Sequence, residues 1–396
     1  MRDKLQKIGL VLGSAFLTLA FIEFLLAIPV YYFVKGNGNT FYSRPHLHWL
    51  FEEDPVLGFK AAPNLKKKNP PPPGLPNAPR RKMWFDLETD NNGFRYNDDL
   101  YGRKPPDEIR IFSLGGSTTF GAESPNKMTY PQQLEDLIHD PKIRVINAGV
   151  GGYRSIHLLK YYQKVIRNFE PDIITIYSGW NDFEDFIASY WEPKNPHGHA
   201  LKSQFELAKI PFGNFSLVWG AGKLYYSFKG YNRTVSVGVD VDLQQKYLRK
   251  ARSQVWQNEH RDNIQELISV AKADGVIPVL IIFPSPQFEN ASSEVKSYAD
   301  QDINMAGNWD AFAIALRHIR SNLRVLAEEN GIPLIDVNNS FEKLNNDYKA
   351  KFNLFVDRQH LTPKGNTVIA ETMLDPIRNI IKKRKLEILN RSQVSR

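Results

Sequence analysis

Hydrophobic positions along most of this chain form short apolar runs that are separated by longer amphipathic stretches. Five runs have the length and composition of strands, at 109–114, 143–147, 173–177, 276–283 and 332–337. Helical patterns separate and follow them, at about 131–139, 155–169, 250–273, 309–329 and 363–385. Strands that alternate with helices are typical of a parallel sheet with helices on both faces. The pattern predicts a doubly wound α/β fold, a three-layer sandwich around a five-stranded parallel sheet.

The N-terminal 35 residues carry a different pattern, a long apolar stretch. Residues 8–34 are apolar except for small polar residues and Glu23. As a helix with a rise of about 1.5 Å per residue, this stretch would exceed the roughly 30 Å hydrocarbon core of a bilayer. Three basic residues precede it, which favours a cytoplasmic N-terminus. We predict an uncleaved transmembrane signal anchor at 1–35, with the rest of the chain on the extracytoplasmic side, periplasmic or at the cell surface. A cleaved signal peptide is the alternative.

Between this stretch and the regular region lies a segment rich in Pro, Asn, Asp and Gly. Within it, residues 70–74 are typical of a semi-rigid extended spacer, and residues 84–89 alternate like a short strand. We predict a linker and lead-in segment over 36–108 and one domain over 109–386. Residues 183–249 form an insertion far longer than an ordinary connection between strand and helix. We expect this insertion to form a cap or side wall.

Composition narrows the chemistry. The chain has 396 residues and no cysteine, which excludes disulfides, zinc–thiolate sites and thiol nucleophiles. The formal net charge is +8, but the basic residues form short runs, at 66–68 and 382–385, and not one long stripe. Short runs of this kind are typical of solvated surface, so we expect no nucleic-acid partner. Attraction to anionic lipid head groups fits the N-terminal stretch better.

The residues that could carry chemistry gather where the predicted strands end. Three strands run into 115–117, 147–152 and 178–182, and a fourth stretch, 357–363, precedes the last helix. Because the carboxyl ends of parallel strands meet at one edge of a sheet, the first three stretches can converge in one crevice.

These stretches hold the groups that acyl transfer needs. A serine hydroxyl such as that of Ser117 needs a base, and the base needs a carboxylate to orient it. Asp357 and His360 lie three residues apart in a tight segment, so both side chains can face one side of a turn. The amides of Ser117 and Gly152 and the side chain of Asn181 could supply fixed donors to an oxyanion. Each stretch alone is more typical of a turn or a cap, but all four in this order favour a serine hydrolase.

Other sites receive less support. The glycines at 115–116 are not followed by the Gly-Lys-Ser/Thr of a phosphate-binding loop. The histidine pairs at 46–48 and 197–199 have neither cysteines nor a carboxylate cluster nearby, which is typical of loop histidines. The acidic residues at 182–185 fit the start of a helix better than paired glycosidase carboxylates. We expect neither a metal nor a nucleotide cofactor.

Together the four stretches resemble the SGNH hydrolases, also called the GDSL esterase/lipase family, whose Ser, Gly, Asn and His lie in four blocks. The resemblance covers roughly 109–182 and 352–385, and the five predicted strands suit a flavodoxin-like sheet order. It implies a nucleophile, a base with its carboxylate, and oxyanion donors: Ser117, His360 and Asp357, with Ser117, Gly152 and Asn181 for the oxyanion. Gly116 stands where the family usually has Asp, and Tyr153 where Asp is frequent. Residues 90–97 look like the lead-in of membrane-anchored members that act at the bacterial envelope.

The sequence therefore predicts an envelope-anchored serine esterase that acts on O-acyl groups, acetyl for example, of a glycan or a lipid. An O-acyltransferase that passes the acyl group to a sugar hydroxyl is one alternative, because the walls of the crevice choose the acceptor. A catalytically silent glycan-binding or assembly partner is another, although a full set of five residues argues against it. The sequence says nothing of the oligomeric state.

Overall fold

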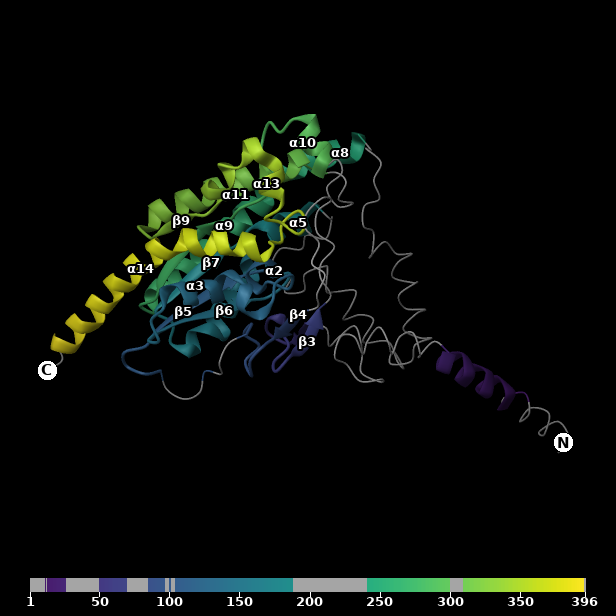
Figure 1. Ribbon diagram of the computed structural model, residues 1–396, viewed down its shortest axis with the longest axis horizontal. Coiled ribbons are helices and arrows are strands. Elements are labelled where there is room, and N and C mark those ends of the chain that lie inside the picture. Colours follow the sequence, from purple (N-terminus) through teal and green to yellow (C-terminus); the bar gives the residue numbers. More distant parts are fainter. Residues whose placement is uncertain are drawn as a thin grey trace. The chain divides into compact units, whose positions relative to one another are not determined.

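The computed structural model describes residues 11, 13–25, 50–69, 85–96, 100, 104–187, 241–299 and 309–394 (Figure 1). The chain divides into two compact units, and the first of them contributes residues 11, 13–25 and 50–53 to the described part. Residues 13–25 are helical. In the described part of the chain, no helix is both long and apolar enough to cross a membrane. Much of the predicted anchor at 1–35 lies outside the described residues.

The second unit is built on a sheet of five parallel strands in the order β6-β5-β7-β8-β9. The strands are β5 (Ile109–Gly115), β6 (Ile143–Gly149), β7 (Ile173–Tyr177), β8 (Ile277–Ile282) and β9 (Leu334–Asp336). Numbered along the chain this order is 2-1-3-4-5, the flavodoxin-like arrangement. The predicted fold class is confirmed for this sheet, and each strand lies within two residues of its predicted bounds. Every residue of β5 and β7 is buried, as expected for strands covered on both faces.

Helices cover the sheet in two groups. One group is α3 (Tyr130–Ile138) and α14 (Pro363–Val394), which pack against each other. The other is α4 (Ser155–Lys164), α9 (Gln254–Ala273) and α11 (Trp309–Asn330), in which α9 contacts both neighbours. Right-handed crossovers place these groups on opposite faces of the sheet. Figure 1 shows α3 and α14 lying together in front of the strands.

The helix bounds differ from the prediction at three places. The pattern at 250–273 is two helices, α8 (Val241–Ala251) and α9, because Ser253 caps the second one and its hydroxyl accepts the Val255 N–H at 3.3 Å. The pattern at 155–169 ends as α4 at Lys164 and continues as the 3₁₀ turn η2 (Ile166–Phe169). The last helix runs beyond 385 to Val394. The predicted insertion begins in α5 (Trp180–Ile187) and ends in α8; its middle lies outside the described residues.

The lead-in segment contains β1 (Phe51–Asp54), β2 (Gly58–Ala61) and an antiparallel pair, β3 (Lys66–Asn69) with β4 (Phe85–Glu88). Its residues from 58 onward belong to the second unit and pack onto the rest of it. Phe59 is fully buried and its carbonyl accepts the Tyr153 hydroxyl at 2.7 Å. The Arg95 N–H donates to Asn147 O at 2.9 Å, on the outer edge of β6. The short strand predicted at 84–89 is β4, whereas the spacer at 70–74 lies outside the described residues.

The remaining described elements are short and connect the sheet to its helices. They are α2 (Ser117–Phe120), η1 (Asn126–Met128), α10 (Ser293–Ala299), α12 (Asn338–Glu342), η3 (Asn345–Asp347) and α13 (Tyr348–Phe352).

Arg95 ties the lead-in segment to the loop that follows α2. Its guanidinium is fully buried, donates to Ser124 O at 2.9 Å and to the Asn126 side chain, and lies 5.7 Å from the centre of the Phe120 ring. Burial lowers the pKa of Arg95 to about 9.

We predict that Arg95→Ala lowers the free energy of unfolding by about 3 kcal/mol, because it leaves buried acceptors unpaired and opens a cavity. Denaturant unfolding of the full chain measures this change. Arg261→Ala is the matched control, since Arg261 pairs with Glu329 at an exposed site and should cost less than about 1 kcal/mol. Equal effects of the two substitutions would contradict a structural role for Arg95.

Candidate active site

Ser117 lies at the carboxyl end of β5, an interior strand between β6 and β7. The strand ends at Gly115, Gly116 precedes the one-turn helix α2, and Ser117 is the first residue of that helix. Gly121 ends the turn with a φ of 70°, in the left-handed region that favours glycine. The chain therefore turns sharply at the edge of the sheet and places the half-buried Ser117 there.

The two glycines before Ser117 are required by close packing. A Cβ on Gly115 would lie 2.1 Å from the Thr119 hydroxyl, and one on Gly116 would lie 2.8 Å from Asn181 Nδ2. Gly116 therefore lets the Asn181 amide approach the backbone next to Ser117. Gly116, which stands where the family usually has Asp, is thus the point at which the Ser117 stretch contacts the Asn181 stretch.

Three of the predicted residues form a continuous hydrogen-bonded series. His360 Nε2 lies 2.8 Å from Ser117 Oγ, and His360 Nδ1 lies 2.6 Å from Asp357 Oδ2. The second carboxylate oxygen of Asp357 accepts the backbone N–H groups of Gln359 and His360, both at 2.8 Å. The segment thus folds as a tight turn in which the carboxylate is fixed by its own backbone.

Short backbone bonds close this turn. The Val356 N–H donates to His360 O at 2.7 Å, and the Thr362 N–H donates to Leu354 O at 2.9 Å. Phe355 and Leu361, which form a bridge between these bonds, are both buried. The imidazole is therefore held by a small β-like loop and not by a long flexible connection.

The other two predicted residues lie beside this series. Gly152 has a φ of 82°, and the carbonyl of the next residue, Tyr153, accepts Asn181 Nδ2 at 2.9 Å. An amide NH₂ group carries two hydrogens, so this bond orients Asn181 and leaves a second hydrogen for a ligand. Asn181 thus contacts the Gly152 loop through Tyr153 and lies next to Gly116, which places all three blocks at one edge.

Tyr153, where the family often has Asp, has a packing role. Its ring stacks on His157 with centroids 5.1 Å apart, and its hydroxyl bonds Phe59 in the lead-in segment. Asp182 is likewise a packing residue in the first turn of α5, where its carboxylate accepts the Ser155 hydroxyl at 2.5 Å. Tyr153 thus holds the Gly152 loop against the lead-in segment, and Asp182 holds the start of α5 against the start of α4.

The electrostatics of the series favour a charged imidazole. Burial by itself lowers the pKa of His360, but Asp357 and Glu123 outweigh burial and raise it to about 9. Burial raises the pKa of Asp357, yet His360 and the two backbone donors bring it below its usual value. The ion pair Asp357–His360 is therefore the favoured charge state of the free site.

Two charged neighbours of the site were missed by sequence reasoning. Glu123 lies in the turn after α2, where burial raises its own pKa and its charge acts on His360. Arg358 follows Asp357 in the sequence and forms an ion pair with Glu184 on α5. Burial lowers the pKa of Arg358 to about 10. No local pattern marks these side chains, because their partners are distant in the sequence.

The histidine pairs at 46–48 and 197–199 lie outside the described residues, as does the aromatic stretch at 210–219 of the insertion. Their roles stay predictions.

Comparison with known proteins identifies the family to which this chain belongs. The model of the GDSL-like lipase/acylhydrolase family matches residues 113–368, which is more than half of the chain. The match includes every residue of the hydrogen-bonded series and both neighbouring blocks. The chain therefore belongs to this family of lipases and acylhydrolases, and it is a serine hydrolase that acts on ester bonds.

Solved structures give a weaker likeness. An acetyl xylan esterase, AlAXEase, is 16% identical with a TM-score of 0.40, over 68% of this chain and 100% of that one. A catalytic mutant of an acetylxylan esterase from Geobacillus stearothermophilus is 15% identical with a TM-score of 0.40, over 69% and 95%. A GDSL-like lipase from Bacteroides thetaiotaomicron is 14% identical with a TM-score of 0.38, over 70% and 93%. Among curated proteins, none matches.

We predict that His360 titrates above the ordinary histidine range and that Glu123→Gln moves its pKa to a lower pH. Removing the Glu123 carboxylate removes a charge that favours the imidazolium, so the sign of the shift is fixed. Nitrogen NMR of the histidine-labelled full chain measures the titration, with His360→Ala to assign the signal. Glu329→Gln, a distant exposed acid, should leave it in place. A titration of His360 that Glu123→Gln does not move would contradict the coupling.

Proposed function

We propose that this protein is an envelope-anchored serine esterase in which Ser117 is the nucleophile, His360 the proton acceptor and donor, and Asp357 the orienting carboxylate. The observation that carries the proposal is the continuous series of hydrogen bonds from Ser117 Oγ through both ring nitrogens of His360 to Asp357. A nucleophile bonded to a base that is oriented by a third group is the arrangement that activates serine.

In the first half of the reaction, Ser117 Oγ attacks the ester carbonyl while its proton moves to His360 Nε2. The negative charge that develops on the carbonyl oxygen is stabilised by the amides of Ser117 and Gly152 and by Asn181 Nδ2. Asp357 accepts the N–H of Nδ1, which holds the imidazole in the tautomer whose Nε2 can accept a proton. His360 then gives the proton to the departing alcohol, and the acyl group stays on Ser117.

In the second half, His360 takes a proton from a water molecule, and the hydroxide oxygen attacks the carbonyl carbon of the acyl group on Ser117. The tetrahedral intermediate uses the same donors, and its collapse releases the carboxylic acid and returns the proton to Ser117 Oγ. The net reaction is hydrolysis: the ester and water give a carboxylic acid and an alcohol, and the enzyme is regenerated. The proposed substrates are O-acyl groups, acetyl for example, of an envelope glycan or lipid.

The membrane anchor in this proposal is the N-terminal helix. At residues 13–25 it exposes large apolar side chains: Phe16, Leu17, Leu19, Phe21, Phe24 and Leu25 are each at least half exposed. Exposed apolar surface of this kind is typical of regions that contact a membrane or another protein. With the basic residues before it, this helix supports attachment to a membrane with the domain on the extracytoplasmic side.

We predict that a fluorescent protein that folds only in the cytoplasm stays dark when it is fused after residue 60 in a bacterial host. The same fusion without residues 1–35 should be bright, because the export and anchoring segment is gone. Fluorescence of cells that carry each fusion is the measurement. A bright full-length fusion would overturn the proposed location and would leave the proposed chemistry intact.

We predict that a serine-reactive phosphonate labels the parent protein on Ser117 and does not label Ser117→Ala. Hydrolysis of p-nitrophenyl acetate should fall on the order of 10⁴–10⁶-fold in Ser117→Ala, as expected when a nucleophile is removed from a triad. Mass spectrometry of the labelled peptide and initial rates are the measurements. Ser321→Ala, on the exposed side of α11, is the control and should match the parent. Undiminished turnover by Ser117→Ala would sink the proposed mechanism.

A further inference from the structure

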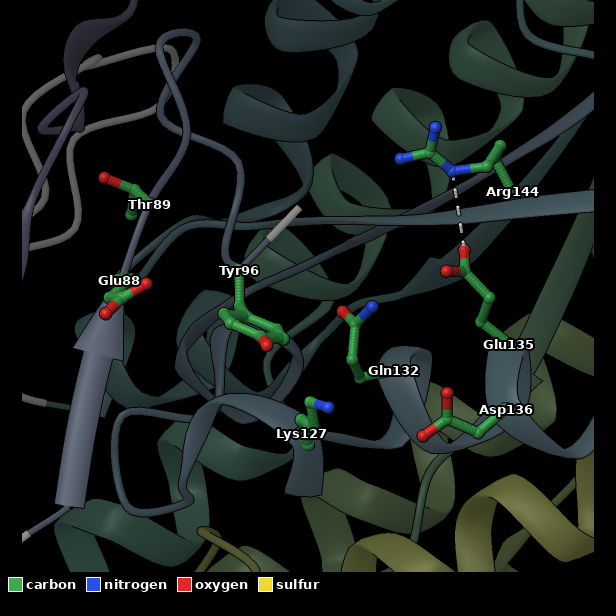
Figure 2. Close-up of a pocket in the computed structure, with 8 residues that line it drawn as sticks. All are labelled: Glu88, Thr89, Tyr96, Lys127, Gln132, Glu135, Asp136 and Arg144. Carbon is green, nitrogen blue, oxygen red and sulfur yellow. Dashed lines mark ion pairs between the residues drawn. The ribbon is translucent and has the colours of Figure 1, made fainter. Parts of the chain in front are cut away.

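A polar pocket with a volume of about 370 Å³ lies beside the edge strand β6. It is bounded by the lead-in segment on one side and by η1, α3 and β6 on the other: Glu88, Thr89, Tyr96, Lys127, Gln132, Glu135, Asp136 and Arg144 (Figure 2). Its volume falls within the roughly 300–1,000 Å³ of small-molecule sites. Unlike most such sites, it is lined almost entirely by polar side chains.

The helix α3 supplies one wall of this pocket through residues that share a face. Gln132, Glu135 and Asp136 are spaced three and four residues apart, the spacing that brings side chains together on one side of a helix. The opposite wall comes from β4 and from Tyr96, which follows the bridge at Arg95. The pocket exists because the lead-in segment covers the edge of the sheet without filling it.

The side-chain amide of Gln132 is the feature of this pocket that indicates a ligand. The residue as a whole is 8% exposed, and its buried amide oxygen has no hydrogen-bond partner among the described residues. Figure 2 shows its amide group projecting into the pocket, on the side of the Tyr96 ring. A buried polar oxygen without a partner costs about 1–3 kcal/mol, so a ligand donor that satisfies it would gain this free energy.

The other walls define the chemistry of that ligand. Glu135 forms an ion pair with Arg144 at 4.0 Å, so these two charges neutralise each other within the pocket wall. Glu88 and Asp136 accept hydrogen bonds, Lys127 donates them, and the Tyr96 ring offers a flat apolar face. Tyr96 is held at a φ of 43°, a left-handed conformation that is uncommon for a bulky residue.

We propose that this pocket binds a neutral saccharide unit. A sugar carries hydroxyl groups that both donate and accept, and its C–H face can lie against an aromatic ring. In this assignment a sugar hydroxyl donates to the Gln132 amide oxygen, the carboxylates and Lys127 bond further hydroxyls, and the Tyr96 ring packs on the sugar face.

This binding site is independent of the proposed esterase centre. None of the residues that line it belongs to the series Ser117–His360–Asp357. Its test can therefore succeed or fail whatever the outcome at Ser117.

The experiment uses saturation-transfer NMR on the full chain, with two neutral probes, maltotriose and N,N′,N″-triacetylchitotriose. The detergent is lauryldimethylamine oxide, because a detergent with a sugar head group would compete. We expect signals from at least one probe with the parent and with Ser117→Ala. Gln132→Leu and Tyr96→Ala should each weaken binding by about tenfold or more, which corresponds to about 1.4 kcal/mol.

Gln163→Leu is the matched control, because Gln163 lies on α4, which covers the other face of the sheet, and this variant should bind as the parent does. Thermal unfolding separates binding from structure. The Tm of Gln132→Leu should equal or exceed that of the parent, since the change removes a buried oxygen without a partner. Absence of signals with both probes would overturn the proposal. So would full binding by Gln132→Leu and Tyr96→Ala, or loss of binding in Ser117→Ala.

Discussion

The hydrogen bond between Ser117 Oγ and His360 Nε2 joins residues 243 positions apart, and the packing of α14 on α3 makes it possible. The serine is fixed just after the end of β5, an interior strand of the sheet. The imidazole is fixed by the loop that leads into α14, so its place depends on where that helix docks. Asn366 of α14 donates to the Ser124 hydroxyl at 2.9 Å, and the Thr367 hydroxyl donates to Gln133 at 2.7 Å. These bonds tie the start of α14 to the loop after α2 and to α3.

A second constraint is the absence of side chains where the blocks meet. Gly116 lets Asn181 reach the backbone beside Ser117, and Gly149 passes so close to α2 that a Cβ would lie 2.2 Å from the Phe120 nitrogen. The end of β6 therefore approaches α2, the helix that begins at Ser117, more closely than any other residue would permit. The donors proposed for the oxyanion depend on this approach, because each comes from a different strand end.

The sheet and the four blocks could be predicted because their signals are local. Buried parallel strands are apolar runs, and glycines mark where these runs must turn. What escaped prediction depends on partners distant in the sequence. The role of Arg95 requires the loop after α2, the pair between Arg358 and Glu184 requires two loops to meet, and the unpartnered oxygen of Gln132 is visible only once the lead-in segment is in place.

The charges around His360 set two requirements against each other. Asp357 and Glu123 favour the imidazolium, which forms as Ser117 loses its proton, and so they stabilise the proposed transition state. The same charges reduce the fraction of neutral imidazole that can accept that proton in the free enzyme. Arg358 opposes them and lowers the pKa of His360, while its pairing with Glu184 fixes its position. Glu184 and Asn181 both lie on α5, so the Arg358–Glu184 ion pair links this helix to the charge that lowers the pKa of His360. The proposed oxyanion donor Asn181 and the proposed base His360 therefore both depend on the position of α5.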